Sequence, residues 1–200
     1  MNYSVKELKS TSIMVLKSEF IGYIFPIFSL DEFNSYLTNI KKEHSKARHA
    51  CYAYKIGSKE RGCDDGEPKG TAGIPLLNAI IKNNLDNVGV IVIRYFGGTL
   101  LGAGRLLRTY LESFETTFKE CSLVLLEEKE LHFVECEYDT FNILSNFLKK
   151  NDFSLRSKEF NDKIKVSFLT PLNTNIDYNT IFLNKVREIK KEIVIDKKDV

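Results

Sequence analysis

Several signals that define common protein classes are missing from this sequence of 200 residues. Its net charge is only +2, from 29 basic and 27 acidic side chains, so it lacks the broad basic surface of many nucleic-acid-binding chains. Its aliphatic runs, such as residues 90–93, are far shorter than the roughly 20 residues that cross a bilayer. The first residues carry charges where a secretory signal needs an apolar core. We therefore expect a cytoplasmic protein without a membrane segment, whose thiols are reduced.

The spacing of metal ligands and of phosphate-binding glycines also excludes familiar sites. Four cysteines and three histidines are scattered, without the C-x-x-C or H-x-x-x-H pairs of a local zinc site. No G-x-x-x-x-G-K-[ST] loop is present, and residues 102–107 lack the third glycine of the dinucleotide fingerprint. These patterns predict neither a metal nor a cofactor.

The composition that remains is that of a folded globular chain, with 43% hydrophobic and 12% aromatic residues. Strands and helices alternate in its first part. Ser29 and Glu32 form a capping box before a helix that ends near residue 45. We expect a bent strand pair over 13–28, a strand over 47–56, a helix over 71–84, a strand over 88–95 and a helix over 104–119.

The rhythm changes after residue 131. Strand patterns over 132–138 and 189–195 enclose a helix around 141–148, two strands joined at a turn near 161–162, and a helix over 177–188. This order is the β-α-β-β-α-β of the ferredoxin-like class. The charged residues 127–130 suggest a boundary, so the sequence predicts two α+β domains, residues 1–128 and 129–200.

Two glycine-rich stretches, 64–73 and 94–104, each precede a predicted helix. Glycine permits positive φ and close backbone approach, and a helix start offers unpaired N–H groups to an anion. Taken singly, each stretch is better explained as a structural turn, but two in one small domain make a shared site more plausible than either stretch does alone. The candidate anion-binding residues here are Lys69, Gly70, Thr71, Gly97, Gly98, Gly102 and Gly104.

Three arginines supply local positive charge around the second stretch. Arg105 and Arg108 lie three residues apart and share one helix face, while Arg94 ends the preceding strand. Arginines beside a helix N-terminus can clamp a polyanion backbone. Solvated surface charge explains them equally well.

The first stretch carries Asp64, Asp65 and Glu67 around Gly66. Three clustered carboxylates are typical of a hard-cation site or an acid–base pair. They are also typical of turns and helix starts, where a negative charge contributes about 0.3–1 kcal/mol.

His49 and Cys51 point to the same face of a predicted strand, as a thiol–imidazole pair would require. No third group that would orient such a pair is evident. Packing of a small buried thiol and a ring is therefore the favoured interpretation, and we assign no catalytic residue.

The ordered motifs HACYAY at 49–54, DDGEPKGTAG at 64–73, RYFGG at 94–98 and LGAG at 101–104 resemble the IMPACT/YigZ family. KSEFI at 17–21 is similar to that family's K-S-x-F-I opening. The resemblance covers roughly residues 10–120. The remainder looks like the ferredoxin-like C-terminal domain of bacterial YigZ proteins by its pattern alone.

The resemblance implies an N-terminal βα lobe of the ribosomal-protein type, followed by a module similar to one in elongation factor G. It implies translation regulation through protein partners for eukaryotic members and nucleic-acid binding for bacterial ones. Arg105 stands where the family usually has glycine, which removes backbone freedom and adds a positive charge at this position.

The leading hypothesis is therefore a non-enzymatic protein that binds RNA or the ribosome and modulates translation, with RNA, the ribosome or a translation-related protein as partner. One alternative is a hydrolase or metal-assisted enzyme that uses the carboxylate loop. Another is a protein-interaction adaptor whose loops are purely structural. The sequence does not indicate an oligomeric state.

Overall fold

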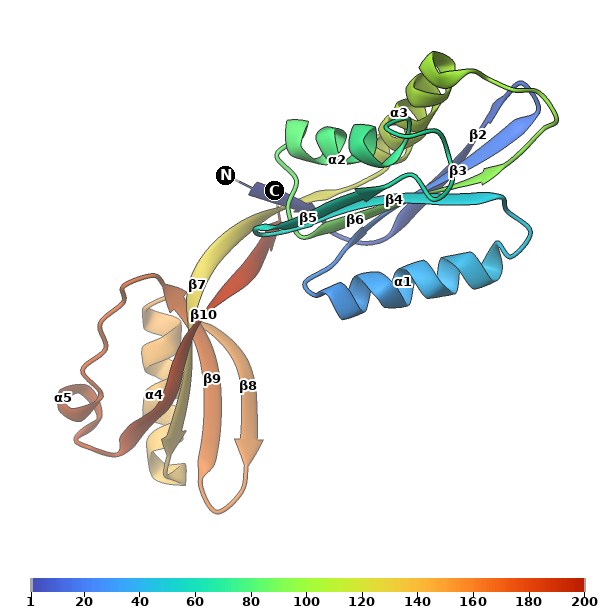
Figure 1. Ribbon diagram of the computed structural model, residues 1–200. Coiled ribbons are helices and arrows are strands. Elements are labelled where there is room, and N and C mark those ends of the chain that lie inside the picture. The colour runs from blue at the N-terminus through green and yellow to red at the C-terminus, as the bar shows by residue number, and fades with distance from the viewer. Residues whose placement is uncertain (1, 200) are drawn as a thin grey trace. The chain divides into compact units, whose positions relative to one another are not determined.

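A computed structural model describes residues 2–199 and divides the chain into two compact units (Figure 1). The first unit runs through Leu125 and includes Lys198 and Asp199, and the second spans Leu126–Lys197. In the described part of the chain, no helix is long and apolar enough to cross a membrane.

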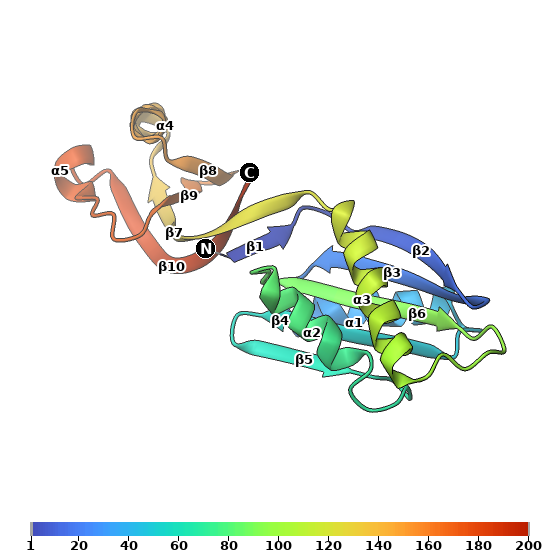
Figure 2. The ribbon, with the colours of Figure 1, turned by 90° about the horizontal axis from the view of Figure 1, so that it is seen from above.

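The first unit is a three-layer α/β/α arrangement. Its antiparallel sheet has the order β2-β3-β6-β4-β5. Helix α1 covers one face of this sheet, and α2 and α3 lie together on the other (Figures 1 and 2). The elements are β1 (Asn2–Val5), β2 (Lys9–Val15), β3 (Ser18–Pro26), α1 (Leu30–Glu43), β4 (His49–Ile56), β5 (Lys59–Cys63), α2 (Gly73–Lys82), β6 (Val88–Tyr95) and α3 (Ala103–Lys119).

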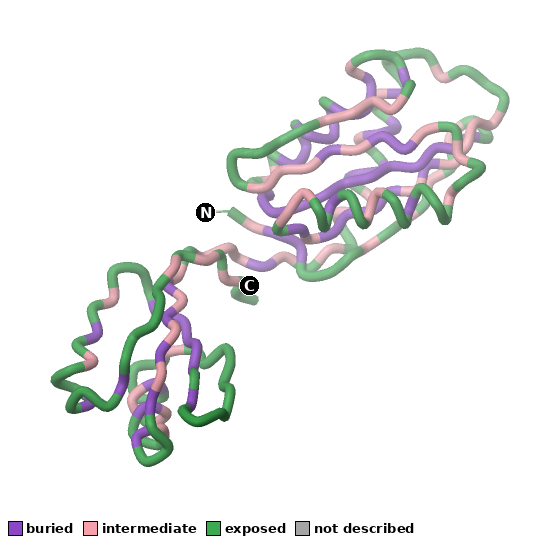
Figure 3. The backbone as a smooth tube through the Cα atoms, turned by 60° about the horizontal axis from the view of Figure 1, so that its bottom comes forward, coloured by how far each residue is buried: buried purple, intermediate pink, exposed green. Residues whose placement is uncertain are grey.

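The central strand β6 explains why both faces of the sheet need helices. Val90 and Val92 pack in the apolar cluster under α2 and α3, while Ile91 and Ile93 pack in the cluster under α1. Figure 3 shows the middle of this sheet as buried and the outer surface of α1 as largely exposed. A continuous apolar run covered on both sides is what the sequence predicts for residues 88–95, and the strand has these bounds.

Local signals set the two elements at the start of this unit. Leu16 and Lys17 both have positive φ in the turn that joins β2 to β3, as a tight hairpin turn with right-handed twist requires. Before α1, the Ser29 hydroxyl accepts the Glu32 N–H at 3.1 Å, and the Glu32 carboxylate accepts the Phe28 N–H at 2.7 Å. The serine half of the capping box therefore forms as expected, while Glu32 reaches back to the N–H of Phe28 in place of that of Ser29.

The second unit has the element order of the ferredoxin-like class. Strands β7, β9 and β8 are neighbours in that order, and β10 also pairs with β7. Helices α4 and α5 contribute side chains to the same core as the inward faces of β7 and β9. The elements are β7 (Leu123–Cys136), α4 (Tyr138–Lys150), β8 (Ser154–Phe160), β9 (Ile164–Pro171), α5 (Tyr178–Phe182) and β10 (Val186–Asp199). The predicted α+β class and β-α-β-β-α-β order are confirmed.

One expectation about the second half needs correction. The helix predicted over 177–188 ends at Phe182, because Leu183 and Asn184 both adopt positive φ, and the chain continues as β10. The charged residues 127–130, at which the sequence suggests a domain boundary, lie inside the continuous strand β7. The division of the chain into the domains 1–128 and 129–200 stays a prediction.

Candidate functional site

The first glycine-rich loop, residues 64–73, folds around the carboxylate of Asp64. This carboxylate accepts N–H groups from Gly70 at 2.8 Å, Ala72 at 3.0 Å and Gly73 at 2.8 Å. The N-cap residue of α2, Ala72, has no side chain able to cap, so Asp64 satisfies the amides at this helix start. Burial, the largest influence, favours the neutral carboxyl, yet the three amides together hold the pKa of Asp64 below its usual range.

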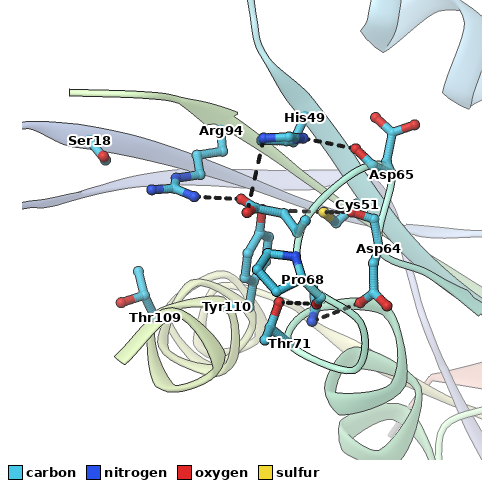
Figure 4. Close-up of polar contacts among 12 residues, drawn as sticks. Ser18, His49, Cys51, Asp64, Asp65, Pro68, Thr71, Arg94, Thr109 and Tyr110 are labelled. Atoms are coloured by element: carbon cyan, nitrogen blue, oxygen red, sulfur yellow. Dashed lines mark hydrogen bonds and ion pairs between the residues drawn. The ribbon is translucent and has the colours of Figure 1, made fainter. Parts of the chain in front are cut away.

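Glu67 of this loop forms a buried ion pair with Arg94, whose side chain Figure 4 shows together with Tyr110 and His49. Its carboxylate accepts from the Arg94 guanidinium at 2.6 Å and from the Tyr110 hydroxyl at 2.9 Å. Glu67 is 9% exposed and Arg94 5% exposed. The guanidinium also lies over the rings of Phe20 and Phe96, with centroids 5.2 and 5.5 Å away. Arg94 thus ties the loop to β6, and it does not stand at the surface beside Arg105 and Arg108.

His49 and Cys51 both face the loop from β4. The His49 Nδ1 lies 2.8 Å from the Asp65 carbonyl, which can only accept, so this nitrogen carries the proton. Cys51 is fully buried and donates its thiol hydrogen to the Asp64 carbonyl at 2.8 Å. Burial raises the pKa of the Cys51 thiol far above its usual range. The thiol is therefore protonated at neutral pH, which makes it a poor nucleophile.

The three carboxylates of the loop do not converge on one point. Asp64 binds backbone amides, Asp65 accepts from the Ala50 N–H at 2.7 Å and pairs with Lys41 at 3.0 Å, and Glu67 pairs with Arg94. Within residues 2–199, no group of three or more acidic, histidine or cysteine side chains is arranged to hold a metal ion. Gly66, which has a φ of 87°, supplies the turn that separates these side chains.

The three other candidate anion-binding residues of this loop differ in how far they are exposed to solvent. Thr71 is 5% exposed and donates its hydroxyl to the Pro68 carbonyl at 2.6 Å. The Gly70 amide is already bound by Asp64. Lys69 is exposed to solvent. Of the three, only Lys69 is therefore free to meet a ligand.

The second glycine-rich loop leads from β6 to α3 and is open to solvent where it joins the helix. Gly97 packs against the β2–β3 turn, and its N–H donates to the Ser18 hydroxyl at 3.0 Å. Gly98 and Gly102 are exposed and have positive φ, 85° and 74°. The loop is thus anchored at its start, while its end presents backbone to solvent.

The start of α3 is basic and uncapped. Its N-cap residue, Gly102, makes no side-chain cap, and the first turn carries no acidic residue. Gly104, Arg105 and Arg108 are all exposed there. Their position places two guanidinium groups beside helix amides that have no side-chain partner, an arrangement suited to phosphate.

Sequence reasoning missed the role of Tyr110. Its spacing in α3 marks it as an apolar-face residue, and it is fully buried. Its hydroxyl nevertheless donates to Glu67 and lies 3.2 Å from the Cys51 sulfur. Burial raises the pKa of Tyr110 far above its usual range. The one available signal was that a buried tyrosine hydroxyl needs a polar partner.

Comparison with known proteins finds one family model and several relatives that match this chain. The Impact N-terminal domain model matches residues 16–118. IMPACT family member YvyE of Bacillus subtilis (strain 168) is 30% identical over 195 residues, which cover 94% of this chain and 90% of that protein. An IMPACT family member of Haemophilus influenzae (strain ATCC 51907 / DSM 11121 / KW20 / Rd) is 34% identical over 75% of each chain.

Two further likenesses differ in their extent. Protein IMPACT of Homo sapiens is 33% identical over 97 residues, which cover 44% of this chain and 30% of that protein. The crystal structure of a hypothetical protein aligns with a TM-score of 0.69 and 20% identity over 93% of this chain and 95% of that one, so it supports the fold alone. From the family model and the full-length relative, the chain belongs to the IMPACT family.

Proposed function

We propose that this chain is a non-enzymatic cytoplasmic protein that binds RNA or the ribosome and thereby modulates translation. The observation that carries the proposal is the start of α3, where exposed Arg105 and Arg108 flank uncapped helix amides with no acidic side chain in the first turn. Family membership supports the link to translation. We further expect a translation-related protein as a partner.

The physical basis is attraction of a phosphate backbone to a small basic site on a nearly neutral chain. A helix N-terminus carries roughly half a positive charge, and α3 has 17 residues along which its peptide dipoles align. Two arginines one turn apart add donors that match phosphate oxygens. Positively charged contacts of this kind position a nucleic-acid backbone without reading its sequence.

The state of the first loop favours binding over catalysis. Its carboxylates are engaged with amides or with cations, and its neighbouring thiol is buried and protonated. A hydrolase that used Asp64, Asp65 or Glu67 would have to break these contacts first. The loop therefore supports the proposal as scaffold, since its Glu67 holds both β6 and α3 beside the second loop.

The test is RNA affinity as a function of salt for the wild type and the double variant Arg105→Ala/Arg108→Ala. Each lost contact to a single-stranded phosphate lowers the slope of log affinity against log salt by about 0.7, so the double variant should lose about 1.4. Lys149→Ala/Lys150→Ala, which removes two exposed charges from the last turn of α4, is the matched control. Equal slopes for wild type and the arginine variant would remove these arginines from the site.

A further inference from the structure

Helices α2 and α3 enclose an elongated groove on the surface of the first unit. Both helices follow the same direction over one face of the sheet (Figure 2), since α2 leads into β6 and α3 follows it. Between them lies a cavity of about 440 Å³, formed by side chains of these two helices and the residue after α2. Arg105 and Arg108, which carry the proposed RNA contact, do not line it.

The floor of the groove is apolar and follows the helix repeat. Leu107, Leu111, Phe114 and Phe118 line it at intervals of four, three and four residues along α3. These intervals place them on one face over about 16 Å, at 1.5 Å per residue. Pro75 and Ala79 of α2 form the opposite wall. A groove between two helix ridges is the shape that a third helix fills.

Charged side chains line the rim of the groove, with positive groups at one end and a negative group one turn away. Lys82 and Lys119 are the last residues of α2 and α3, so both ammonium groups lie at the same end of the groove. Both are exposed, and among the described residues neither forms a salt bridge. Glu115, also exposed, lines the groove one turn before Lys119. A negative group is favoured at the lysine end, and a positive group one turn further in.

We propose that this groove binds an amphipathic α-helix of a partner protein, with an acidic residue in the first turn of that helix against Lys82 and Lys119. The partner helix then lies antiparallel to α2 and α3, so that its positive N-terminal end meets their negative C-terminal ends. Its apolar residues at i, i+4, i+7 and i+11 fill the floor, and a basic residue one turn after the acid meets Glu115. A fatty acyl chain fits less well, because it offers nothing to Glu115 or to the rim amide of Asn78.

The test uses the full chain and a labelled helical peptide of about four turns, with leucine at i, i+4, i+7 and i+11, glutamate in its first turn and arginine one turn after the glutamate. One control peptide has scrambled leucine positions, and a second has lysine in place of glutamate. The charge-reversed variant Lys82→Glu/Lys119→Glu changes only exposed side chains, and Lys149→Glu/Lys150→Glu controls for net charge.

We expect the variant Lys82→Glu/Lys119→Glu to bind the glutamate peptide about tenfold more weakly than the wild type, and to bind the lysine peptide more tightly. Equal binding of the scrambled peptide, or no exchange of preference, overturns the proposal. Self-association of the chain that Lys82→Glu/Lys119→Glu abolishes, without any peptide binding, would assign the groove to a second copy and would also overturn the proposal. Binding of palmitate but of neither peptide would overturn it as well. The variant Arg105→Ala/Arg108→Ala should still bind the peptide, because these arginines do not line the groove. Failure of the RNA proposal can therefore be told apart from failure of the groove proposal.

Discussion

The buried pair of Glu67 and Arg94 provides the strongest quantitative prediction. Glu67→Gln keeps the shape and an oxygen that accepts from both Arg94 and Tyr110, but it removes the negative charge. A guanidinium that is 5% exposed then has no counter-ion. Breaking a buried pair in this way costs about 3–5 kcal/mol, and the retained hydrogen bonds place the expected loss at the lower end, about 3 kcal/mol.

A second substitution separates the charge effect from a simple packing defect. Arg94→Met in the Glu67→Gln background removes the unpaired cation and replaces it with an apolar chain of similar length beside Phe20 and Phe96. We expect the double variant to recover at least about 1.5 kcal/mol, because an apolar replacement of a buried pair is often close to neutral.

The assay is urea unfolding of the full chain, monitored by circular dichroism. Amide hydrogen exchange in β6 reports the stability of the first unit separately. A loss of less than about 1 kcal/mol for Glu67→Gln, or additive effects of the two substitutions, would show that the charge of Glu67 does not stabilise buried Arg94. In that case the loop would be held by its backbone contacts, and Arg94 would be free for another role.

Other predictions follow from single contacts. Asp64→Asn should lower the free energy of unfolding by about 1 kcal/mol near neutral pH. Because folding lowers the pKa of Asp64 from its ordinary value of 3.8, the carboxylate stabilises the fold above pH 3.8 and loses this effect as the pH falls through the folded pKa. Unfolding curves of the wild type and the variant should therefore converge in acid. Cys51 should react with iodoacetamide at least about tenfold more slowly than half-buried Cys63, measured by mass spectrometry, and equal rates would contradict its burial. Gly97→Ala should lower stability by about 1–3 kcal/mol in urea titrations, since a Cβ there would overlap the backbone of Lys17, and an unchanged midpoint would show that the turn yields.

Long apolar patterns were readable from the sequence, and polar strands were not. Strand β6 and helix α3 lie almost where hydrophobic spacing predicts them, because tertiary burial reinforces the local signal. Strand β5, Lys59–Cys63, was missed because its residues are largely polar and exposed, with no alternation to mark a strand. It forms by pairing with β4 at the sheet edge, which is information from tertiary structure.

The candidate site shows the same division between local and long-range information. The sequence singled out both glycine-rich loops, since glycines before helices are a local signal. It did not reveal that Arg94 pairs with Glu67, because the two residues are 27 positions apart and meet only when β6 joins the sheet. Equally, the exposure of Arg105 and Arg108 depends on which face of α3 packs on the sheet.

Cross-linking in living cells tests whether the exposed start of α3 contacts RNA, as we propose. Ultraviolet cross-linking in living cells, followed by identification of the modified peptides and the bound RNA, reports both the partner and the contact. We predict RNA cross-links within residues 97–108, which are lost in the Arg105→Ala/Arg108→Ala variant. Recovery of the chain without RNA, or with cross-links that this variant leaves unchanged, would rule out an RNA contact by Arg105 and Arg108.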